Sequence, residues 1–168
     1  GIEENLALAA RRGKRRTLRW GIKKVEREDY RELLRTLDLG LEDRLSAKAG
    51  LLSGGQRQAL TLLMAALVQP KLLLLDEHTA ALDPKTAAKV LELSEQIVTE
   101  NHLTTLMVTH NMRDAINLGN RLIMMSEGRV VLDIRGAEKK RLTVEDLLER
   151  FTAASGKEFS NDRVLLGA

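Results

Sequence analysis

A continuous apolar run constrains the fold of this chain more than any other feature. The segment 71–75, which is Lys71 followed by four leucines, is preceded by Pro70 and followed directly by Asp76-Glu77. A short apolar run without polar alternation is typical of a parallel strand that is buried on both faces. The segment 104–109, with Leu106, Met107 and Val108 between threonines, is interpreted as a second buried strand. With a helical stretch between them, the two runs predict a strand–helix–strand unit, and therefore an α/β fold.

Helices and a hairpin are predicted around these two strands. Apolar residues recur at helical spacing in several segments, with capping and stop signals at their ends. Glu127-Gly128 is a hairpin signal, and Thr143-x-x-Asp146 resembles a capping box. The first expected helices are 2–10, 26–39 with Gly40 as its stop, and a helix from Ser53 to about Val68. They are followed by a helix that Asp83 caps, with Pro84 at its first position, running to about Glu100, by a short helix over 113–118, and by a last helix beginning at Thr143. The expected hairpin strands are 121–126 and 129–134.

The composition excludes several classes of protein. The chain has 168 residues, enough for one domain or one domain with a small appendage, and no cysteine, which excludes disulfides and thiolate chemistry. Aromatic residues make up only 2%, which argues against stacking on single-stranded nucleic acid. No apolar run is long enough for a transmembrane helix. A basic stretch over 11–24 indicates an exposed loop, or else contact with acidic lipid or nucleic acid.

A glycine-rich loop precedes the second long helix. Ser53 is a good helix N-cap, and Gly54 and Gly55 leave backbone N–H groups unobstructed. Such groups, at the positive end of a helix dipole, make an anion site, so phosphate is a candidate ligand. An ordinary capped helix start explains the same residues equally well.

Two acidic residues and a histidine follow the two predicted strands. Asp76 and Glu77 come after the first strand, and His110 ends the second. Ligands of α/β sheets bind at the carboxyl ends of strands, so these side chains are well placed for function. One carboxylate would hold Mg²⁺ through water, the other would act as general base, and the histidine would bond a phosphate oxygen or the attacking water. The alternatives are a solvated acidic turn and a structural histidine; His78 and His102 lack this placement.

Taken together, the motifs resemble one family. The segment 52–58 resembles the signature motif of ATP-binding cassette (ABC) ATPases, and 72–77 resembles their Walker B strand. Ala81-Leu82-Asp83 is similar to their D-loop, and His110 to their switch histidine. The order is that of the family and the spacing comes close to it. His78 departs from the pattern, because many members carry proline there, but the carboxylates are unchanged.

The resemblance covers about residues 2–150 and implies the carboxy-terminal part of an ABC ATPase. The implied fold is a partial P-loop α/β fold. It has a helical signature subdomain over 1–58, the carboxy-terminal part of the parallel-sheet core with a terminal hairpin and helix over 59–154, and a tail over 155–168. ATP and Mg²⁺ are the implied ligands. The resemblance implies that Asp76 binds Mg²⁺ through water, that Glu77 polarises the hydrolytic water and that His110 contacts the γ-phosphate. It implies that Ser53, Gly54 and Gly55 contact the γ-phosphate of ATP on a second subunit. It also implies that Gln56 shapes the signature loop and that Asp83 lies at the dimer interface.

The family's phosphate-binding loop is missing from this sequence. No G-x-x-x-x-G-K-[ST] occurs, and neither Gly13-Lys14 nor Gly156-Lys157 has the required neighbours. The family's Q-loop is also missing, so we expect the chain to begin just after it. We therefore expect the chain alone to be inactive. Because the first strands of the sheet would also be missing, we expect association through the uncovered strand edges.

Three functions fit these motifs. The first is an ATPase subunit of a bacterial importer of solutes such as amino acids, peripheral on the inner face of the cell membrane. Its partners would be a second, identical ATPase subunit and transmembrane permease subunits, without direct contact to nucleic acid. The second is a non-transport ABC ATPase acting on nucleic acid or the ribosome, supported by the basic stretch 11–24. The third is a phosphate-sensing binding module, which would need neither Glu77 nor His110.

Overall fold

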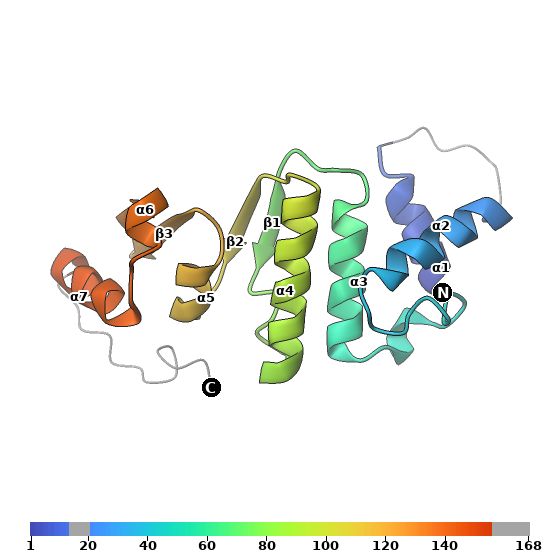
Figure 1. Ribbon diagram of the computed structural model, residues 1–168, viewed down its shortest axis with the longest axis horizontal. Helices are drawn as coiled ribbons and strands as arrows, with labels where there is room; N and C mark the ends of the chain where they lie inside the picture. The colour runs from blue at the N-terminus through green and yellow to red at the C-terminus, as the bar shows by residue number, and fades with distance from the viewer. Residues whose placement is uncertain (14–20, 156–168) are drawn as a thin grey trace. The chain divides into compact units, whose positions relative to one another are not determined.

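The computed structural model describes residues 1–13 and 21–155 (Figure 1). Half of the expected loop 11–24, and all of the expected tail 155–168 except its first residue, therefore lie outside the described residues. The elements, in chain order, are α1 (Ile2–Ala10), α2 (Lys24–Arg35), a 3₁₀ turn η1 (Ala49–Leu51), α3 (Gly54–Ala66), β1 (Leu73–Asp76), α4 (Pro84–Glu100), β2 (Thr105–Val108), α5 (Met112–Asn117), β3 (Arg121–Ser126), β4 (Arg129–Arg135), α6 (Gly136–Lys139) and α7 (Val144–Ser155).

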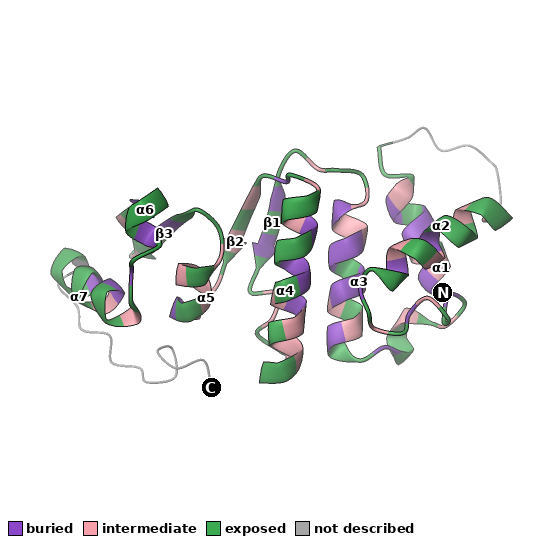
Figure 2. Cartoon of the chain, viewed as in Figure 1, coloured by how far each residue is buried: buried purple, intermediate pink, exposed green. Residues whose placement is uncertain are grey.

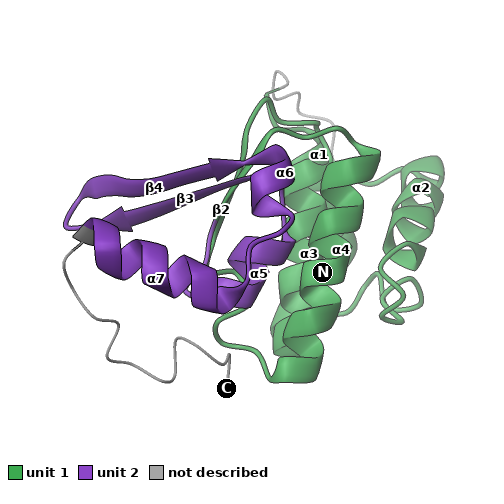
Figure 3. Cartoon of the chain, turned by 60° about the vertical axis from the view of Figure 1, so that its left-hand side comes forward, with its two compact units in different colours: residues 1–107 green, residues 108–168 purple. Residues whose placement is uncertain are grey.

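The chain forms two compact units, residues 1–107 and 108–168 (Figure 3). The first unit contains the helices α1 to α4 and a parallel pair of strands, β1 and β2. The second contains the antiparallel hairpin of β3 and β4 with α5 to α7. The predicted mixed α/β fold is confirmed. Among the described residues, no helix is long and apolar enough to cross a membrane.

One apolar cluster holds the first unit together. Leu73 and Leu75 of β1 share it with Leu60 and Leu63 of α3 and with Leu93 of α4. Figure 2 shows the buried faces of α3 and α4. These faces form because apolar residues recur every three or four positions along each helix. The amino-terminal helices and the segment after α2 add side chains with no exposed surface to the same cluster, namely Ile2, Leu6, Leu34, Leu37 and Leu41.

The prediction that both faces of the two strands are buried was wrong. Buried and exposed residues alternate along β1, and half-buried and exposed residues along β2. Leu74 is 64% exposed and Leu106 is 51% exposed. The physical reason is that successive side chains of a strand point to opposite faces, and the helices of the first unit cover one face only. The association that we expect through these strands stays a prediction.

Helix α2 ends before the position that the sequence indicates. The predicted segment was 26–39, with Gly40 as its stop, whereas α2 ends at Arg35. Asp38 already has φ of 51°, in the left-handed region, and Gly40 follows with φ of 65°. Aspartate tolerates this region better than most residues, and the helical pattern of the sequence does not reveal that a turn uses it here.

The hairpin of the second unit follows the sequence closely. In the register of β3 and β4, Ser126 faces Arg129, and the two residues between them form the turn. Glu127 has φ of 50° and Gly128 has φ of 75°, which is the pattern of a two-residue type I′ turn. The predicted capping box at the start of α7 is also confirmed, since Asp146 N–H donates to Thr143 Oγ1 and Thr143 N–H donates to Asp146 Oδ2. The sequence did not indicate α6.

A buried lysine joins α6 to the end of α5. Lys139 is 2% exposed, and its ammonium donates to the carbonyl oxygens of Ile116 and, at 2.8 Å, of Leu118. These carbonyls lie at the C-terminus of α5, where a cation also favours the helix dipole. Burial lowers the pKa of Lys139, because desolvation disfavours the charged form.

We predict that Lys139→Met lowers the free energy of unfolding by about 1–3 kcal/mol, because two carbonyl groups lose their donor. Lys140→Met is the matched control, since Lys140 is exposed and its substitution should stay within about 0.5 kcal/mol of the native chain. Urea unfolding followed by circular dichroism measures both. Equal unfolding free energies for the two variants would contradict the structural role of Lys139.

Candidate functional site

The glycine-rich loop is a tightly capped helix start. Ser53 Oγ accepts from Gln56 N–H at 3.2 Å, and Gln56 Oε1 accepts from Ser53 N–H at 3.2 Å, which completes a capping box. Gln56 Nε2 also donates to the carbonyl oxygen of Leu39 at 3.1 Å, so the loop is tied to the segment after α2. Gln56 thus holds the loop through its hydrogen bonds to Ser53 and to the Leu39 carbonyl.

The two glycines of this loop have different surroundings. Gly54 is exposed and Gly55 is buried. A Cβ on Gly55 would lie 2.1 Å from Cγ2 of Thr86, the third residue of α4. A Cβ on Gly54 would lie 3.1 Å from Cδ2 of Leu82, the end of a flexible side chain. Glycine at 55 therefore allows the first turns of α3 and α4 to touch. Ser53 and Gly54 lie on the exposed side of the loop.

This contact brings the loop beside the predicted D-loop. Asp83 is the N-cap of α4, as predicted, and accepts from Thr86 N–H at 3.1 Å. The Thr86 side chain and the Thr86 backbone N–H together hold the pKa of Asp83 below its usual value, because they stabilise the charged carboxylate. Thr86 therefore contacts Gly55 through its methyl group and Asp83 through its donors.

The two carboxylates lie at the carboxyl end of β1. Asp76 is the last residue of the strand, Glu77 follows it, and both are exposed. Glu77 has φ of 41°, so the chain turns sharply as it leaves the sheet. Their backbone positions match the predicted strand end.

The structure does not bring all predicted residues into one unit. Ser53, Gly54, Gly55, Gln56, Asp76, Glu77 and Asp83 belong to the first unit, and His110 to the second. His110 lies two residues beyond the end of β2, is exposed, and precedes Asn111, the N-cap of α5.

The donor set at the strand end fits Mg²⁺ only with additional ligands. Carboxylate oxygens suit Mg²⁺, and the exposure of Asp76 allows an intervening water. Among the described residues, however, no three acidic or histidine side chains come together as a metal-binding group. Mg²⁺ at Asp76 would therefore need oxygen atoms from another source, such as the phosphates of a nucleotide.

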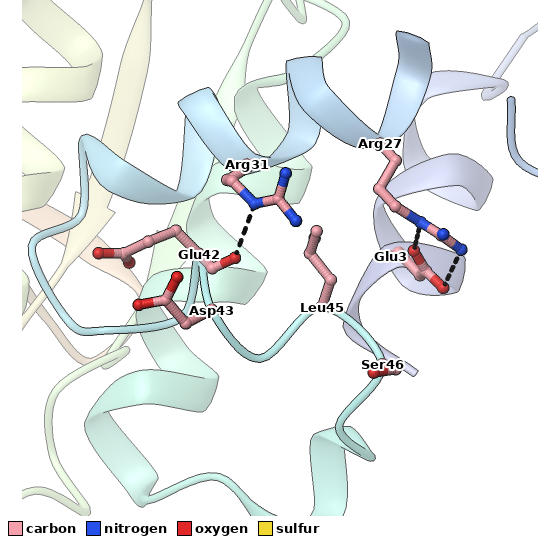
Figure 4. Close-up of a pocket in the computed structure, with 7 residues that line it drawn as sticks. All are labelled: Glu3, Arg27, Arg31, Glu42, Asp43, Leu45 and Ser46. Carbon is pink, nitrogen blue, oxygen red and sulfur yellow. Dashed lines mark hydrogen bonds and ion pairs between the residues drawn. The ribbon is translucent and has the colours of Figure 1, made fainter. Parts of the chain in front are cut away.

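A polar hollow of about 240 Å³ lies elsewhere in the first unit (Figure 4). Arg27 forms a two-pronged ion pair with Glu3, at 2.6 and 3.0 Å, and Arg31 Nε donates to the carbonyl oxygen of Glu42 at 3.4 Å. Asp43, Leu45 and Ser46 complete the lining. None of the predicted site residues lines it, so its shape gives no support to the site.

Comparisons with known proteins agree on one family. The family model described as ABC transporter matches residues 2–80. A tyrosine transport ATP-binding protein of Clostridioides difficile is 50% identical over 91% of this chain and 61% of its own length. An aliphatic sulfonates import ATP-binding protein of Paraburkholderia xenovorans is 41% identical over 67% of this chain and 33% of its own length. This chain therefore spans less than two thirds of these relatives.

Solved structures with the same fold belong to the same family. A putative metal-chelate type ABC transporter in an inward-facing conformation has a TM-score of 0.66 and 25% identity, covering 92% of this chain and 58% of its own. An ATP-binding cassette of an ABC transporter, in its ADP conformation, has a TM-score of 0.65 and 25% identity, covering 83% of this chain and 57% of its own.

We predict that Gly55→Ala lowers the free energy of unfolding by about 1–3 kcal/mol, because the added methyl collides with Thr86. The collision outweighs the gain of about 1 kcal/mol that alanine brings to a helix. Urea unfolding should show a much smaller effect for the matched variant Gly54→Ala, whose methyl meets only the end of Leu82.

A second substitution tests the cause of this effect. Thr86→Ser removes the colliding methyl and keeps the hydroxyl, so Gly55→Ala with Thr86→Ser should regain the native stability or exceed it. If the double variant is as unstable as Gly55→Ala alone, the contact with Thr86 is not the reason for glycine at this position.

Proposed function

Because the chain is part of an ABC transporter ATP-binding domain, we propose that it belongs to the ATP-binding and ATP-hydrolysing subunit of a bacterial solute importer. One observation carries this proposal: the loop from Ser53 to Gln56 is a capped helix start whose buried glycine packs against the first turn of α4. That contact joins the signature and D-loop motifs, which are 28 positions apart at Gly55 and Asp83, in one surface.

The signature loop is proposed to act on a nucleotide held by a second subunit. The first N–H groups of α3 have no acceptor within the helix, and the helix dipole places positive charge there. Ser53 and Gly54 are exposed and can approach a γ-phosphate, whereas Gly55 contributes chiefly by close packing. Asp83, capping the adjacent helix, would lie at the same interface.

The carboxylates are proposed to act on a nucleotide bound by their own subunit. Asp76 would hold Mg²⁺ through water, and Glu77 would polarise the hydrolytic water as general base. His110 would contact the γ-phosphate. The metal ion, when bound with ATP, supplies positive charge that offsets the charge of the phosphates. The chain has no G-x-x-x-x-G-K-[ST], so the phosphate-binding loop for that nucleotide is not within its 168 residues.

The relatives support import over action on nucleic acid. Their names describe transport of tyrosine and import of aliphatic sulfonates. An amino acid or another small solute is therefore the proposed cargo, with permease subunits and a second ATPase subunit as partners and the inner face of the cell membrane as the location. Half of the basic stretch 11–24, which favoured a nucleic-acid partner, lies outside the described residues.

We predict that the purified 168-residue chain hydrolyses no ATP, and that the complete subunit containing it does. Glu77→Gln should abolish turnover of the complete subunit, since a glutamine amide cannot accept a proton from water. Phosphate release from ATP and Mg²⁺ measures both.

The control is Glu100→Gln, at the exposed end of α4, which should leave turnover unchanged. Hydrolysis by the 168-residue chain that disappears in its Glu77→Gln variant would contradict the proposed need for a separate phosphate-binding loop. Full turnover of the complete subunit with Glu77→Gln would contradict the role given to Glu77.

A further inference from the structure

The loop between β1 and α4 has an unusual backbone. Glu77 has φ of 41°, a conformation that residues other than glycine seldom adopt. Ala80 N–H donates to the Glu77 carbonyl at 3.0 Å, and Leu82 N–H donates to the Thr79 carbonyl at 3.1 Å, so the loop consists of successive turns. A backbone in a sparsely populated region persists only where its surroundings hold it. Contacts outside the loop should therefore fix its first residues.

His78 provides such a contact. Its Nε2 lies 2.9 Å from Ser94 Oγ, which belongs to the buried face of α4. Ser94 is 4% exposed and lies among apolar residues, so its hydroxyl has few possible partners. The bond spans 16 positions and ties the residue after Glu77 to the middle of the helix.

The direction of this hydrogen bond follows from the serine. A hydroxyl has one hydrogen, and Ser94 Oγ donates it to the Val90 carbonyl at 2.7 Å. Ser94 Oγ must therefore accept from His78, and His78 must carry its proton on Nε2. Both the neutral Nε2–H tautomer and the doubly protonated ring have this proton, so the bond does not depend on the charge of the histidine.

Proline at this position, which many members of the family carry, would hold the loop in a different way. Proline fixes its own φ and restricts the preceding residue to extended conformations. Glu77 here is not extended, because its φ is 41°. The chain therefore replaces a covalent restriction by a hydrogen bond to a neighbouring helix, and that bond requires a donor at 78 and an acceptor at 94.

We propose that His78 is a positioning residue, which fixes the backbone of Glu77 through its hydrogen bond to Ser94. This inference rests on the function proposed for Glu77, since it assigns His78 the task of aiming that carboxylate. It also makes Ser94, a buried polar residue of α4, part of the support of the site. As a positioning residue, His78 itself contacts neither the nucleotide nor the attacking water.

The first test uses nuclear magnetic resonance of the 168-residue chain. Imidazole ¹⁵N shifts should show His78 with a proton on Nε2. His78→Phe and Ser94→Ala should each shift the Glu77 amide resonance, and each should speed hydrogen exchange at the Ala80 N–H by about tenfold, the change expected for one lost hydrogen bond. The double variant should exchange no faster than either single variant. His78→Gln, whose amide can donate to Ser94, should stay close to the native chain.

Thr99→Ala is the matched control for Ser94→Ala, because Thr99 is an exposed residue of the same helix. It should move neither the Glu77 resonance nor the exchange rate of Ala80. A neutral His78 protonated on Nδ1 alone, or exchange at Ala80 that is the same in His78→Phe as in the native chain, would overturn the proposed link.

The second test measures ATP turnover of the complete subunit. His78→Phe should lower kcat about tenfold and leave KM for ATP unchanged, and His78→Gln should recover most of the loss. If native turnover depends on Glu77 but His78→Phe keeps the native kcat, the positioning role is wrong and the proposed function stands. If the complete subunit hydrolyses no ATP, the proposed function is wrong, and the Glu77 amide resonance together with the exchange rate at the Ala80 N–H still decides whether His78 fixes this loop.

Discussion

The contact between the first turns of α3 and α4 is the constraint on which the candidate site depends. Helix axes normally lie 8–10 Å apart, and the approach is limited by the side chains at the contact. At Gly55 there is no side chain, so the Thr86 methyl reaches the helix backbone. The signature loop therefore lies beside Asp83, whose cap on α4 uses the same threonine. A larger residue at 55 would separate two motifs that the proposed function needs together.

Helix α4 supports more than this contact. Its first turn carries Asp83 and touches the signature loop, and its middle holds Ser94, the acceptor for His78. The two ends of the loop between β1 and α4 are thus attached to one helix, at Asp83 through the chain itself and at His78 through a hydrogen bond. The buried residues of α4 in turn share one apolar cluster with β1 and α3.

The sequence predicted those features that depend on neighbouring residues. Ser53, Asp83 and Thr143 are caps, and Glu127-Gly128 is a turn, because each satisfies backbone groups only a few positions away. The sequence did not predict the features that depend on residues far away in the chain. The exposed face of Leu74 follows from what covers the sheet, which no apolar run can reveal. The predicted roles of the site residues stay predictions, because they concern ligands and a second subunit.

Gly55 and His78 show why neighbouring residues in the sequence do not reveal which residues hold a site in place. In the sequence Gly55 is a phosphate-binding glycine like Gly54, and only the position of Thr86, 31 residues later, separates their roles. His78 is a departure from the family pattern beside unchanged carboxylates, and only the buried hydroxyl of Ser94 gives it a partner. Under the proposed function, Glu77 acts on the nucleotide of its own subunit and Ser53 on that of its partner. Since both loops are attached to α4, a displacement of this helix at one nucleotide would move residues at the other, so the two sites should respond to each other through a packed helix.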